Sequence, residues 1–292
     1  MDSRFLETLV LVVELGSIAE AARRLDLTSA TVAQRVRALE AEVGSRLVMR
    51  AGRTTRATVA GMRVVAHAHA VLREVRDLFS AASGTELPAG PLRLGATPTA
   101  MMGMVPALLG KWVKRHPSIE VYIEPANTTL LHDRVMRGEL DAAILVQPAF
   151  DFPKTVSWRA LRKEPLVLVT PAAMNVRSAL ATIAAEPFIR YDRNVIGGRL
   201  ADDYLRRNGV KPNVRFELDG IENISRLVAE GLGVSVLPDW EDGRSNRAVK
   251  KWPLPPPCPA RTVGLMWMRS GVRSPLAVAI GDLILEEARS RR

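Results

Sequence analysis

The stretch that decides the fold runs from Ser17 to Gly44 and reads SIAEAARRLDLTSATVAQRVRALEAEVG. Ser17 followed by Glu20 is a capping box, in which a hydroxyl and a carboxylate satisfy free amides at a helix start. It predicts an alanine-rich helix over residues 18–25, followed by a short turn at Asp26–Leu27. A second helix comes directly after this turn, and two helices joined in this way form the helix-turn-helix pattern.

The second of these helices is expected to begin at Thr28, a suitable N-cap, and to end near Val43. Apolar residues recur along it at helical spacing and predict a buried stripe of Val32, Val36, Leu39 and Val43. The opposite face, near the N-terminus, is the part that enters the major groove in such motifs. The residues predicted to contact DNA from this helix are Thr28, Ser29, Ala30, Ala33, Gln34 and Arg37. Gln34 can donate to and accept from adenine, and Ala30 or Ala33 can touch a thymine methyl. A helical bundle with a solvated polar face is the alternative.

A basic segment follows this helix. Residues 46–58 read RLVMRAGRTTRAT and predict a strand, a turn at Ala51–Gly52 and a second strand. Every charged residue from Arg46 to Arg63 is an arginine. A basic hairpin directly after a recognition helix is a wing, whose arginines can neutralise phosphates or enter the minor groove. The wing residues expected to contact DNA are Arg50, Arg53 and Arg56.

Upstream, residues 4–15 have helical apolar spacing and are expected to form a helix that ends at Gly16. In order and register, residues 4–61 resemble the winged helix-turn-helix of LysR-type transcriptional regulators. The residues that carry the resemblance are Phe5, Leu9, Gly16, Ser17, Ala21, Ala22, Leu25, Leu39, Glu40, Gly44, Leu47, Arg50, Gly52, Arg53, Thr58 and Gly61. The resemblance implies a homo-oligomeric, ligand-responsive, bacterial DNA-binding regulator. The family commonly has Gln-Pro in place of Ser29–Ala30 and Ser-Arg in place of Ala33–Gln34, so no operator sequence is inherited.

Composition sets the class of protein. The 292 residues, 47% hydrophobic and 25% charged, predict a globular chain of two domains. The single cysteine, Cys258, excludes an intramolecular disulfide and a cysteine-built zinc site, and favours a reducing compartment. The sequence has no charged-then-apolar leader, and no apolar run approaches the ~18 residues that span a bilayer, so a cytoplasmic protein without a membrane partner is expected. The net charge of +10 favours nucleic acid or an anionic ligand as partner, with solubility as the alternative.

A long helix is expected from Val59 to about Ser83. It contains a heptad seam made of Val64, Ala68, Val71, Val75, Leu78 and Ala82. A self-pairing coiled coil is one interpretation and packing on its own domain is the other. The resemblance implies a dimerisation linker, and hence a homodimer or a dimer of dimers. With a Pro- and Gly-containing linker over 84–91, the expected domains are a DNA-binding domain (1–58), a linker helix and hinge (59–90) and an effector-binding domain (91–292).

After Pro91 strands alternate with helices, which predicts an α/β fold with parallel strands. Strands are expected over 92–96, 121–124, 142–146, 166–170, 187–191, 214–217 and 263–267, and helices over 99–115, 128–138, 198–208, 222–230 and 275–289. The run 231–238 is expected to contain a helix stop followed by a buried strand. The pattern restarts near Pro187, so two similar halves with a ligand site between them are expected. The resemblance implies a two-lobed effector domain like that of periplasmic solute-binding proteins.

Backbone amides at helix N-termini attract anions at the carboxyl ends of strands. The candidates that end a strand, follow one or begin a helix are Thr97, Thr99, Thr128, Val146, Gln147, Arg193, Asn194, Val195 and Ile196. The resemblance implies that polar residues at Thr99 and Thr128 hold oxygen atoms of a ligand, and Arg193 can pair with a carboxylate. The predicted effector is a small, carboxylate-type metabolite. Plain helix capping and a solvated arginine are the alternatives for these residues.

Enzyme signatures are lacking in the sequence. Gly231 and Gly233 precede a strand and lack a third glycine, so they are not a dinucleotide fingerprint. The four histidines, His67, His69, His116 and His132, show no metal spacing, and we expect no catalytic residue, metal or cofactor. The favoured function is a LysR-type regulator whose DNA binding is modulated by an effector between two lobes. The alternatives are a cytoplasmic small-molecule-binding module whose N-terminal bundle only oligomerises and, with least support, an α/β enzyme.

Overall fold

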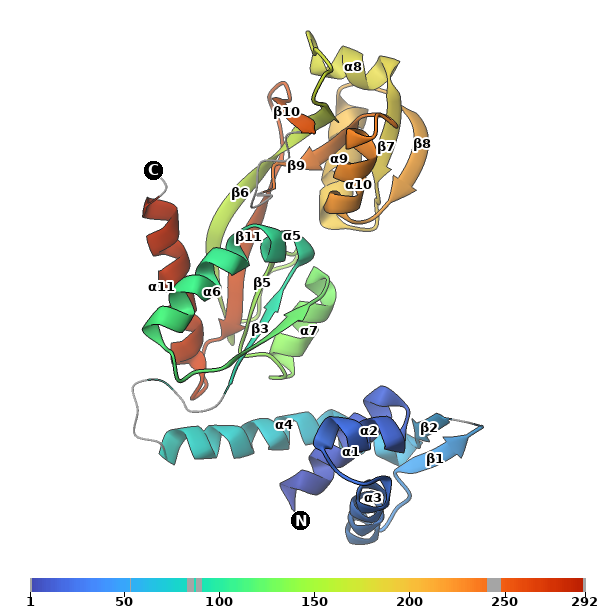
Figure 1. Ribbon diagram of the computed structural model, residues 1–292, viewed down its shortest axis with the longest axis vertical. Coiled ribbons are helices and arrows are strands. Elements are labelled where there is room, and N and C mark those ends of the chain that lie inside the picture. Colours follow the sequence, from blue (N-terminus) through green and yellow to red (C-terminus); the bar gives the residue numbers. More distant parts are fainter. Residues whose placement is uncertain (1, 53, 83–86, 88–90, 241–247, 291–292) are drawn as a thin grey trace. The chain divides into compact units, whose positions relative to one another are not determined.

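The computed structural model describes residues 2–52, 54–82, 87, 91–240 and 248–290. The chain divides into two compact units, the first built mainly from Met1–Ala89 and the second from most of residues 90–292 (Figure 1). The first unit is mainly helical, and the second combines sheets with helices. Among the described helices, none is both long and apolar enough to span a lipid bilayer.

The first unit is a helix-turn-helix with a hairpin and a long final helix. Its elements are α1 (Ser3–Leu15), α2 (Ile18–Leu25), α3 (Ser29–Val43), β1 (Val48–Ala51), β2 (Thr54–Ala57) and α4 (Val59–Ala82). The Ser17 hydroxyl accepts a bond from the Glu20 amide at 3.3 Å, and the Thr28 hydroxyl accepts one from the Thr31 amide at 3.1 Å. Only half of the predicted capping box forms, because the Glu20 carboxylate pairs with Arg23 instead of turning back to the cap.

The core of this unit consists of two apolar clusters. One contains Leu6, Leu9, Val10, Leu39, Leu47 and Ala68, and the other contains Val12, Ala21, Ala22, Val32 and Val36. Three of the four residues predicted for the buried stripe of α3 are therefore buried. Val43 is the exception and is 42% exposed, because it is the last residue of the helix and extends past the core.

The hairpin is attached to the helices by hydrogen bonds from both sides. The Glu40 carboxylate accepts bonds from the amides of Leu47 at 2.7 Å and Val48 at 3.2 Å, which ties the start of β1 to α3. The Thr55 amide donates to the carbonyl of Gly16 at 2.8 Å, which ties β2 to the α1–α2 turn. The wing therefore has a fixed position relative to α3.

The two halves of the predicted heptad seam on α4 have different surroundings. Val64 and Ala68 pack into the core of the first unit, so this half of the seam packs on its own domain. Further along, Val71 is 38% exposed and Leu78 is 68% exposed, and the neighbouring Phe79 is 69% exposed. Self-pairing thus stays a prediction for the second half of the helix.

The second unit contains the remaining elements. They are β3 (Leu92–Ala96), α5 (Pro98–Met102), α6 (Met104–Arg115), β4 (Val121–Pro125), α7 (Thr128–Met136), β5 (Ala142–Val146), β6 (Val156–Pro171), α8 (Ala179–Ala185), β7 (Pro187–Tyr191), α9 (Ile196–Arg207), β8 (Asn213–Leu218), α10 (Ile221–Ala229), β9 (Ser235–Pro238), β10 (Val249–Pro253), β11 (Ala260–Met268) and α11 (Ser274–Ser290). The predicted helix over 99–115 is two helices, since the chain bends at Gly103 between α5 and α6.

The strands are not all parallel, which corrects the prediction. The main sheet has the order β10-β6-β11-β5-β3-β4, with β9 also paired to β6, and β7 and β8 form a second pair. Strand β3 is parallel to β4 and β5, and β7 is parallel to β8. Strand β11 is antiparallel to β5 and β6, and β6 is antiparallel to β9 and β10. The antiparallel pairs arise because β6 and β11 carry the chain from one half to the other and back.

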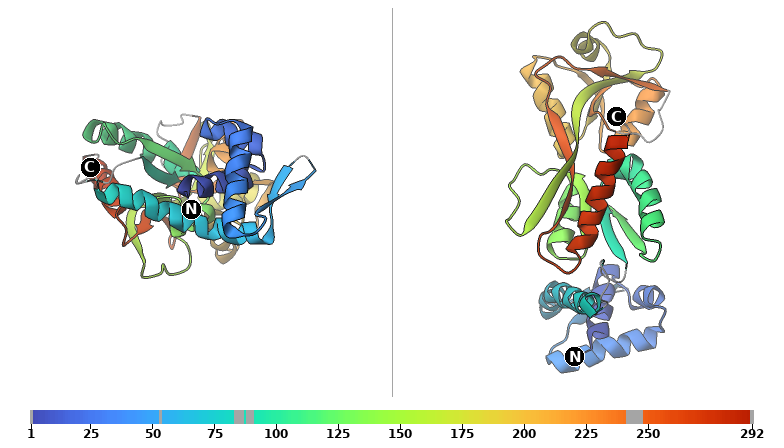
Figure 2. Two further views of the ribbon diagram at one scale, coloured as in Figure 1. Left: turned by 90° about the horizontal axis from the view of Figure 1, so that it is seen from below. Right: turned by 90° about the vertical axis from the view of Figure 1, so that its left-hand side faces the viewer.

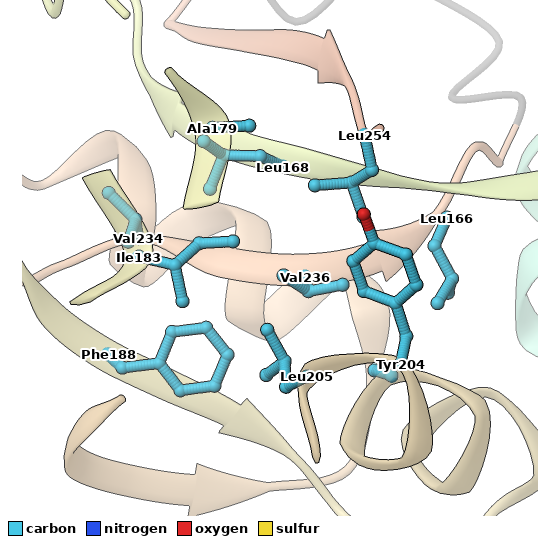
Figure 3. Packing of buried hydrophobic residues seen from close by; sticks show 11 residues of the cluster. Leu166, Leu168, Ala179, Ile183, Phe188, Tyr204, Leu205, Val234, Val236 and Leu254 are labelled. Atoms are coloured by element: carbon cyan, nitrogen blue, oxygen red, sulfur yellow. The ribbon is translucent and has the colours of Figure 1, made fainter. Parts of the chain in front are cut away.

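These crossing strands join two lobes. The first part of β6 pairs with β11 and the last part pairs with β9 and β10, so the single 16-residue strand belongs to both lobes. Helices α5, α6, α7 and α11 belong to the first lobe, where α11 lies beside α6 (Figure 2). Helices α8, α9 and α10 belong to the second lobe, whose core includes Phe188, Tyr204 and Leu205 (Figure 3). The predicted fold class, a winged helix-turn-helix, a long helix and a two-lobed α/β domain, is confirmed.

Candidate functional site

The predicted contact face of α3 is open to solvent. Thr28, Ser29, Ala30, Gln34 and Arg37 are exposed and Ala33 is half-buried. The residues of the opposite face, Val32 and Val36, are buried in the core. Helix α3 is therefore anchored by one face and presents polar and basic side chains with the other, as insertion into a major groove requires.

The wing adds exposed cationic side chains next to this helix. Arg50 on β1 and Arg56 on β2 are both exposed, and Arg53 lies outside the described residues. The Arg50 Nε donates to the carbonyl of Gly52 at 3.1 Å, so part of this guanidinium is held along the hairpin. Met49, the cross-strand neighbour of Arg56, is 54% exposed. The hairpin thus combines positive charge with an apolar side chain.

The second unit contains a pocket of about 620 Å³. Its lining includes Thr97, Thr99, Thr128 and Val146 from the first lobe and Tyr191, Asn194, Val195, Ile196 and Gly220 from the second. Arg261, on the crossing strand β11, also lines it. A concave site of this size between two lobes is the usual setting for a small-molecule ligand.

Three helices of eight residues or more begin at this pocket, namely α7, α9 and α10. Asn127 caps α7, because its side-chain oxygen accepts a bond from the Leu130 amide at 2.9 Å. The N-caps of α9 and α10, Val195 and Gly220, provide no side-chain acceptor. The first amides of these two helices are therefore available to an anion at the pocket.

Two glycines bring the start of α9 close to the end of β7. A Cβ on Gly197 would lie 2.6 Å from Cε1 of Tyr191, and a Cβ on Gly198 would lie 1.9 Å from the carbonyl oxygen of Asp192. A larger residue at either position would push the helix away from the strand. The two glycines therefore set the position of the α9 N-terminus at the pocket.

A buried charged cluster forms part of the pocket wall. Arg261 is 5% exposed, and its Nε donates to Oε2 of Glu164, itself 4% exposed, at 2.7 Å. The Arg261 Nη2 donates to the hydroxyl of Thr99 at 3.2 Å. This guanidinium thus connects β6, β11 and the start of α5. Arg261 was not predicted from the sequence, because nothing local marks it except its position before a buried strand.

Tyr191 and Thr97 add hydroxyl groups to the same wall. Burial raises the pKa of Tyr191 to about 12, although the neighbouring Arg261 opposes the rise, so this phenol stays protonated at neutral pH. Thr97 is 5% exposed, and its Oγ1 has no hydrogen-bond partner within the described residues. A buried hydroxyl without a partner at a pocket is a natural contact for a ligand oxygen.

Aromatic rings line another part of the pocket. The Phe150 ring lies edge-to-face against His132, with centroids 5.1 Å apart. Phe152 contacts both of these rings at 6.3 Å and Trp158 at 5.1 Å. Phe150 and His132 line the pocket, and Phe150 is 55% exposed. We call these four residues the aromatic cluster.

The pocket includes most, but not all, of the residues predicted for it. Thr97, Thr99, Thr128, Val146, Asn194, Val195 and Ile196 are among its lining residues. Gln147 and Arg193 are not. Gln147 is exposed and its amide donates to the Thr262 carbonyl. Arg193 pairs with Glu217, with its Nε 3.0 Å from Oε1, so the predicted pairing of Arg193 with a ligand carboxylate is replaced by an internal ion pair.

No group of three or more His, Cys, Asp or Glu side chains in the described part of the chain is placed to hold a metal ion. Cys258 is half-buried, and its Sγ donates to the carbonyl of Leu166 at 3.3 Å. Burial raises the pKa of this thiol. A raised pKa lowers the thiolate fraction at neutral pH and hence the reactivity of the cysteine.

Comparisons with known proteins match both units. A family model described as bacterial regulatory helix-turn-helix protein, lysR family, matches residues 3–62, and one described as LysR substrate binding domain matches residues 85–289. The chain is 31% identical over 247 residues to the uncharacterised HTH-type transcriptional regulator YnfL of Escherichia coli strain K12, with 82% of each chain covered.

Solved structures extend the comparison to the whole chain. A full-length OxyR point variant from Pseudomonas aeruginosa has a TM-score of 0.70 and 27% identity, covering 97% of this chain and 94% of that one. Full-length CbnR in complex with its target DNA has a TM-score of 0.66 and 19% identity, covering 100% of both chains. At 19% identity the similarity to CbnR concerns the fold alone.

Proposed function

The chain belongs to the LysR family of regulatory helix-turn-helix proteins, and on that premise we propose that it binds promoter DNA under the control of a small anionic metabolite. The family consists of transcriptional regulators and not of enzymes. One of its members, CbnR, has been solved in complex with its target DNA. The family assignment therefore favours a regulator over a binding module whose N-terminal bundle serves only to oligomerise.

The observation that carries the DNA part of the proposal is the exposed face of α3 beside a basic wing. Thr28, Ser29, Ala30, Ala33, Gln34 and Arg37 are proposed to contact bases and the adjoining backbone. Arg50, Arg53 and Arg56 are proposed to contact phosphates or the minor groove. The hydrogen bonds of Glu40 to the start of β1 support this assignment, because they fix the wing relative to α3.

Fluorescence anisotropy with the DNA upstream of the protein's own coding sequence tests this part. Arg56→Ala removes one phosphate contact, so we expect weaker binding to every duplex and a salt slope lower by about 1. Gln34→Ala removes a base contact, so we expect about 1–3 kcal/mol less discrimination at one base pair.

Arg226→Ala is the matched control, because Arg226 is an exposed arginine of the second unit, with a side chain 72% exposed. It is expected to leave both the affinity and the salt slope unchanged. Binding that does not respond to salt, or an equal effect of Arg56→Ala and Arg226→Ala, would contradict DNA recognition by the wing.

The pocket supports the second part of the proposal, control by a small anionic metabolite. The uncapped N-termini of α9 and α10, the unpartnered Thr97 hydroxyl and the Thr99–Arg261 pair all offer hydrogen-bond donors or positive charge to a ligand. Thr128 is tied to the same wall, since its hydroxyl accepts a bond from the Val146 amide at 3.3 Å. A ligand that contacts both lobes can favour one arrangement of the lobes, and such a preference is what couples binding to DNA affinity.

The second half of α4 supports self-association. Val71, Leu78 and Phe79 are exposed apolar residues on one long helix. A solvated helix face of this kind gains stability when a second copy covers it. A homodimer, or a dimer of dimers, would place two wings on one duplex and so contact two half-sites.

Thiol chemistry is not expected to transmit the signal. Cys258→Ser should leave DNA affinity unchanged before and after treatment with hydrogen peroxide, because the raised pKa of the thiol suppresses the reactive thiolate. A second cysteine for an intramolecular disulfide is not in the sequence. We expect the native chain to react with iodoacetamide at least ~10-fold more slowly at pH 7.5 than the urea-unfolded chain, which exposes the thiol. Equal rates would refute this interpretation.

A further inference from the structure

We propose that the metabolite recognised by the pocket is a monocarboxylate on a flat, aromatic or conjugated body. Its carboxylate would lie at Thr99 and Arg261, and its flat body would lie against Phe150 and His132. The inference rests on the proposed function, because it names the ligand class of the same pocket. It combines three observations, namely the aromatic cluster, the balance of charges along the pocket and the size of the pocket.

The aromatic cluster is the first observation. Phe, Trp and Tyr together make up only 5% of the sequence, yet Phe150, Phe152 and Trp158 lie within one short segment. Their rings contact one another or His132 in stacked, tilted or edge-to-face arrangements. Phe150 nevertheless keeps 55% of its surface exposed while it lines the pocket. A large aromatic side chain held by a neighbouring ring and left open on a pocket wall is suited to a flat apolar partner.

The remaining lining agrees with an apolar body. Besides the polar groups, the pocket is lined by Pro98, Pro125, Ala126, Val146, Pro148 and Ala149. These side chains offer contact area and no hydrogen bonds. A ligand that carries many hydroxyl groups would bury them there without partners, at a cost in affinity.

The charges along the pocket favour a single carboxylate over a polyanion. Two arginines, Arg199 and Arg261, line it together with two aspartates, Asp133 and Asp219, so their formal charges cancel. Glu164 lies directly behind Arg261 at 2.7 Å. A phosphate ester or a tricarboxylate would therefore bring two or three negative charges to a wall whose side chains carry no net positive charge. One carboxylate instead finds directed donors at Arg261 and the hydroxyls of Thr97 and Thr99.

The pocket is large enough for a ligand that is much bigger than its anionic group. Pockets of roughly 300–1,000 Å³ enclose ligands of drug size. At about 620 Å³ the cavity leaves most of its volume unfilled by a carboxylate alone. Phe150, His132 and the apolar residues form the wall that the rest of such a ligand would contact.

Isothermal titration of the full-length chain with defined probes tests the inference. The probes are 2-naphthoate, benzoate, cyclohexanecarboxylate, benzamide and citrate. We expect benzoate to bind about fivefold more tightly than cyclohexanecarboxylate, which has the same charge without a flat ring. Benzamide, which lacks the charge, and citrate, which is a polyanion, should bind at least ~10-fold more weakly than benzoate. We expect 2-naphthoate to bind most tightly, because it fills more of the pocket.

Two variants test which wall of the pocket contacts the ring of the ligand and which contacts its carboxylate. Phe150→Leu keeps apolar bulk and removes the ring, so it should abolish the preference for benzoate over cyclohexanecarboxylate. Thr99→Val removes a hydroxyl at the carboxylate end, so it should weaken both acids equally and leave the preference for benzoate over cyclohexanecarboxylate unchanged. Phe216→Leu is the matched control, because Phe216 on β8 is 42% exposed and is not among the pocket-lining residues. It should change none of the affinities.

The outcomes separate this inference from the proposed function. Equal affinities for benzoate and cyclohexanecarboxylate, tighter binding of citrate, or no binding of any of the aromatic acids would overturn the ligand class. In each of these cases, salt-dependent DNA binding that is sensitive to Arg56→Ala would still support the regulator. Loss of that DNA binding, with the probe affinities as expected, would instead overturn the proposed function and leave a binding protein for aromatic acids.

Discussion

Replacing Arg261 with methionine is expected to lower the free energy of unfolding of the second unit by about 3 kcal/mol, the lower end of the range for a broken buried ion pair. The substitution leaves the carboxylate of Glu164 without the guanidinium that lies 2.7 Å away. Glu164 is only 4% exposed, so water cannot replace the lost partner. The guanidinium of Arg162 remains, with its Nε 3.7 Å from Oε1 of Glu164, but it is farther away and its side chain is 32% exposed. It therefore compensates the buried carboxylate only in part, and a poorly compensated charge in a medium of low dielectric constant is strongly destabilising.

Urea denaturation of the full-length chain, followed by tryptophan fluorescence, measures this loss. The Glu164→Gln/Arg261→Met double variant should recover most of the lost stability, because it removes both charges together. Arg226→Met is the surface control. Its partner Glu222 is 50% exposed and Arg226 is 72% exposed, so the loss should stay within about 0.5 kcal/mol. A loss for Arg261→Met as small as that for Arg226→Met would show that the buried pair is well solvated.

The same pair shows where prediction from the sequence ends. Glu164 and Arg261 are 97 residues apart and meet because they are direct neighbours in the register of β6 and β11. Strand register depends on the packing of the whole sheet and cannot be taken from either strand alone. The apolar pattern predicts only parts of these strands, over 166–170 and 263–267, and does not include the charged residues that precede them.

The prediction that Arg193 lines the pocket is wrong because its partner lies on another strand. Its position after β7 was predicted, but its partner was not, because Glu217 comes from β8, the strand parallel to β7. The threonines at the starts of α5 and α7 were easier to place. The carboxyl end of a strand and the start of the following helix are local features, and parallel strands bring several such ends to one edge.

The helix-turn-helix was predictable for the same local reason. Its helix limits are set by residues such as Ser17, Thr28 and Gly44, each of which acts within one turn of its own position. The attachment of the wing was not predictable. It depends on the Glu40 carboxylate reaching the amides of Leu47 and Val48. It also depends on a glycine in α4 that allows Leu47, just before β1, and Ala57 of β2 to lie against the helix.

That glycine is Gly61. We expect Gly61→Ala, which adds a single methyl group, to weaken DNA binding strongly. A Cβ on Gly61 would lie 1.9 Å from the carbonyl oxygen of Leu47 and 3.3 Å from the Cβ of Ala57. The obstacle at Leu47 is backbone, so it cannot rotate away. Helix α4 must therefore move away from the wing and disturb the bond from the Thr58 amide to the same carbonyl, which measures 2.9 Å.

We expect Gly61→Ala to destabilise the first unit by about 3 kcal/mol, at the upper end of the range for overpacked sites. Because α4 also covers the core that holds α1, the wing should lose its position relative to α3. DNA affinity measured by anisotropy should consequently fall by at least ~10-fold, which corresponds to about 1.4 kcal/mol. The probe affinities of the pocket, which belongs to the second unit, should stay unchanged.

Gly110→Ala provides the matched control, since Gly110 also lies inside a helix, α6, and a Cβ there would meet nothing within 4 Å. In a helix interior alanine is favoured over glycine by about 0.5–1 kcal/mol, so this variant should be slightly more stable and bind DNA normally. Opposite signs for the two substitutions would show that the effect at Gly61 comes from the close approach of Leu47 and not from the loss of glycine. If Gly61→Ala bound DNA as tightly as Gly110→Ala, then a fixed wing would not be needed for DNA recognition.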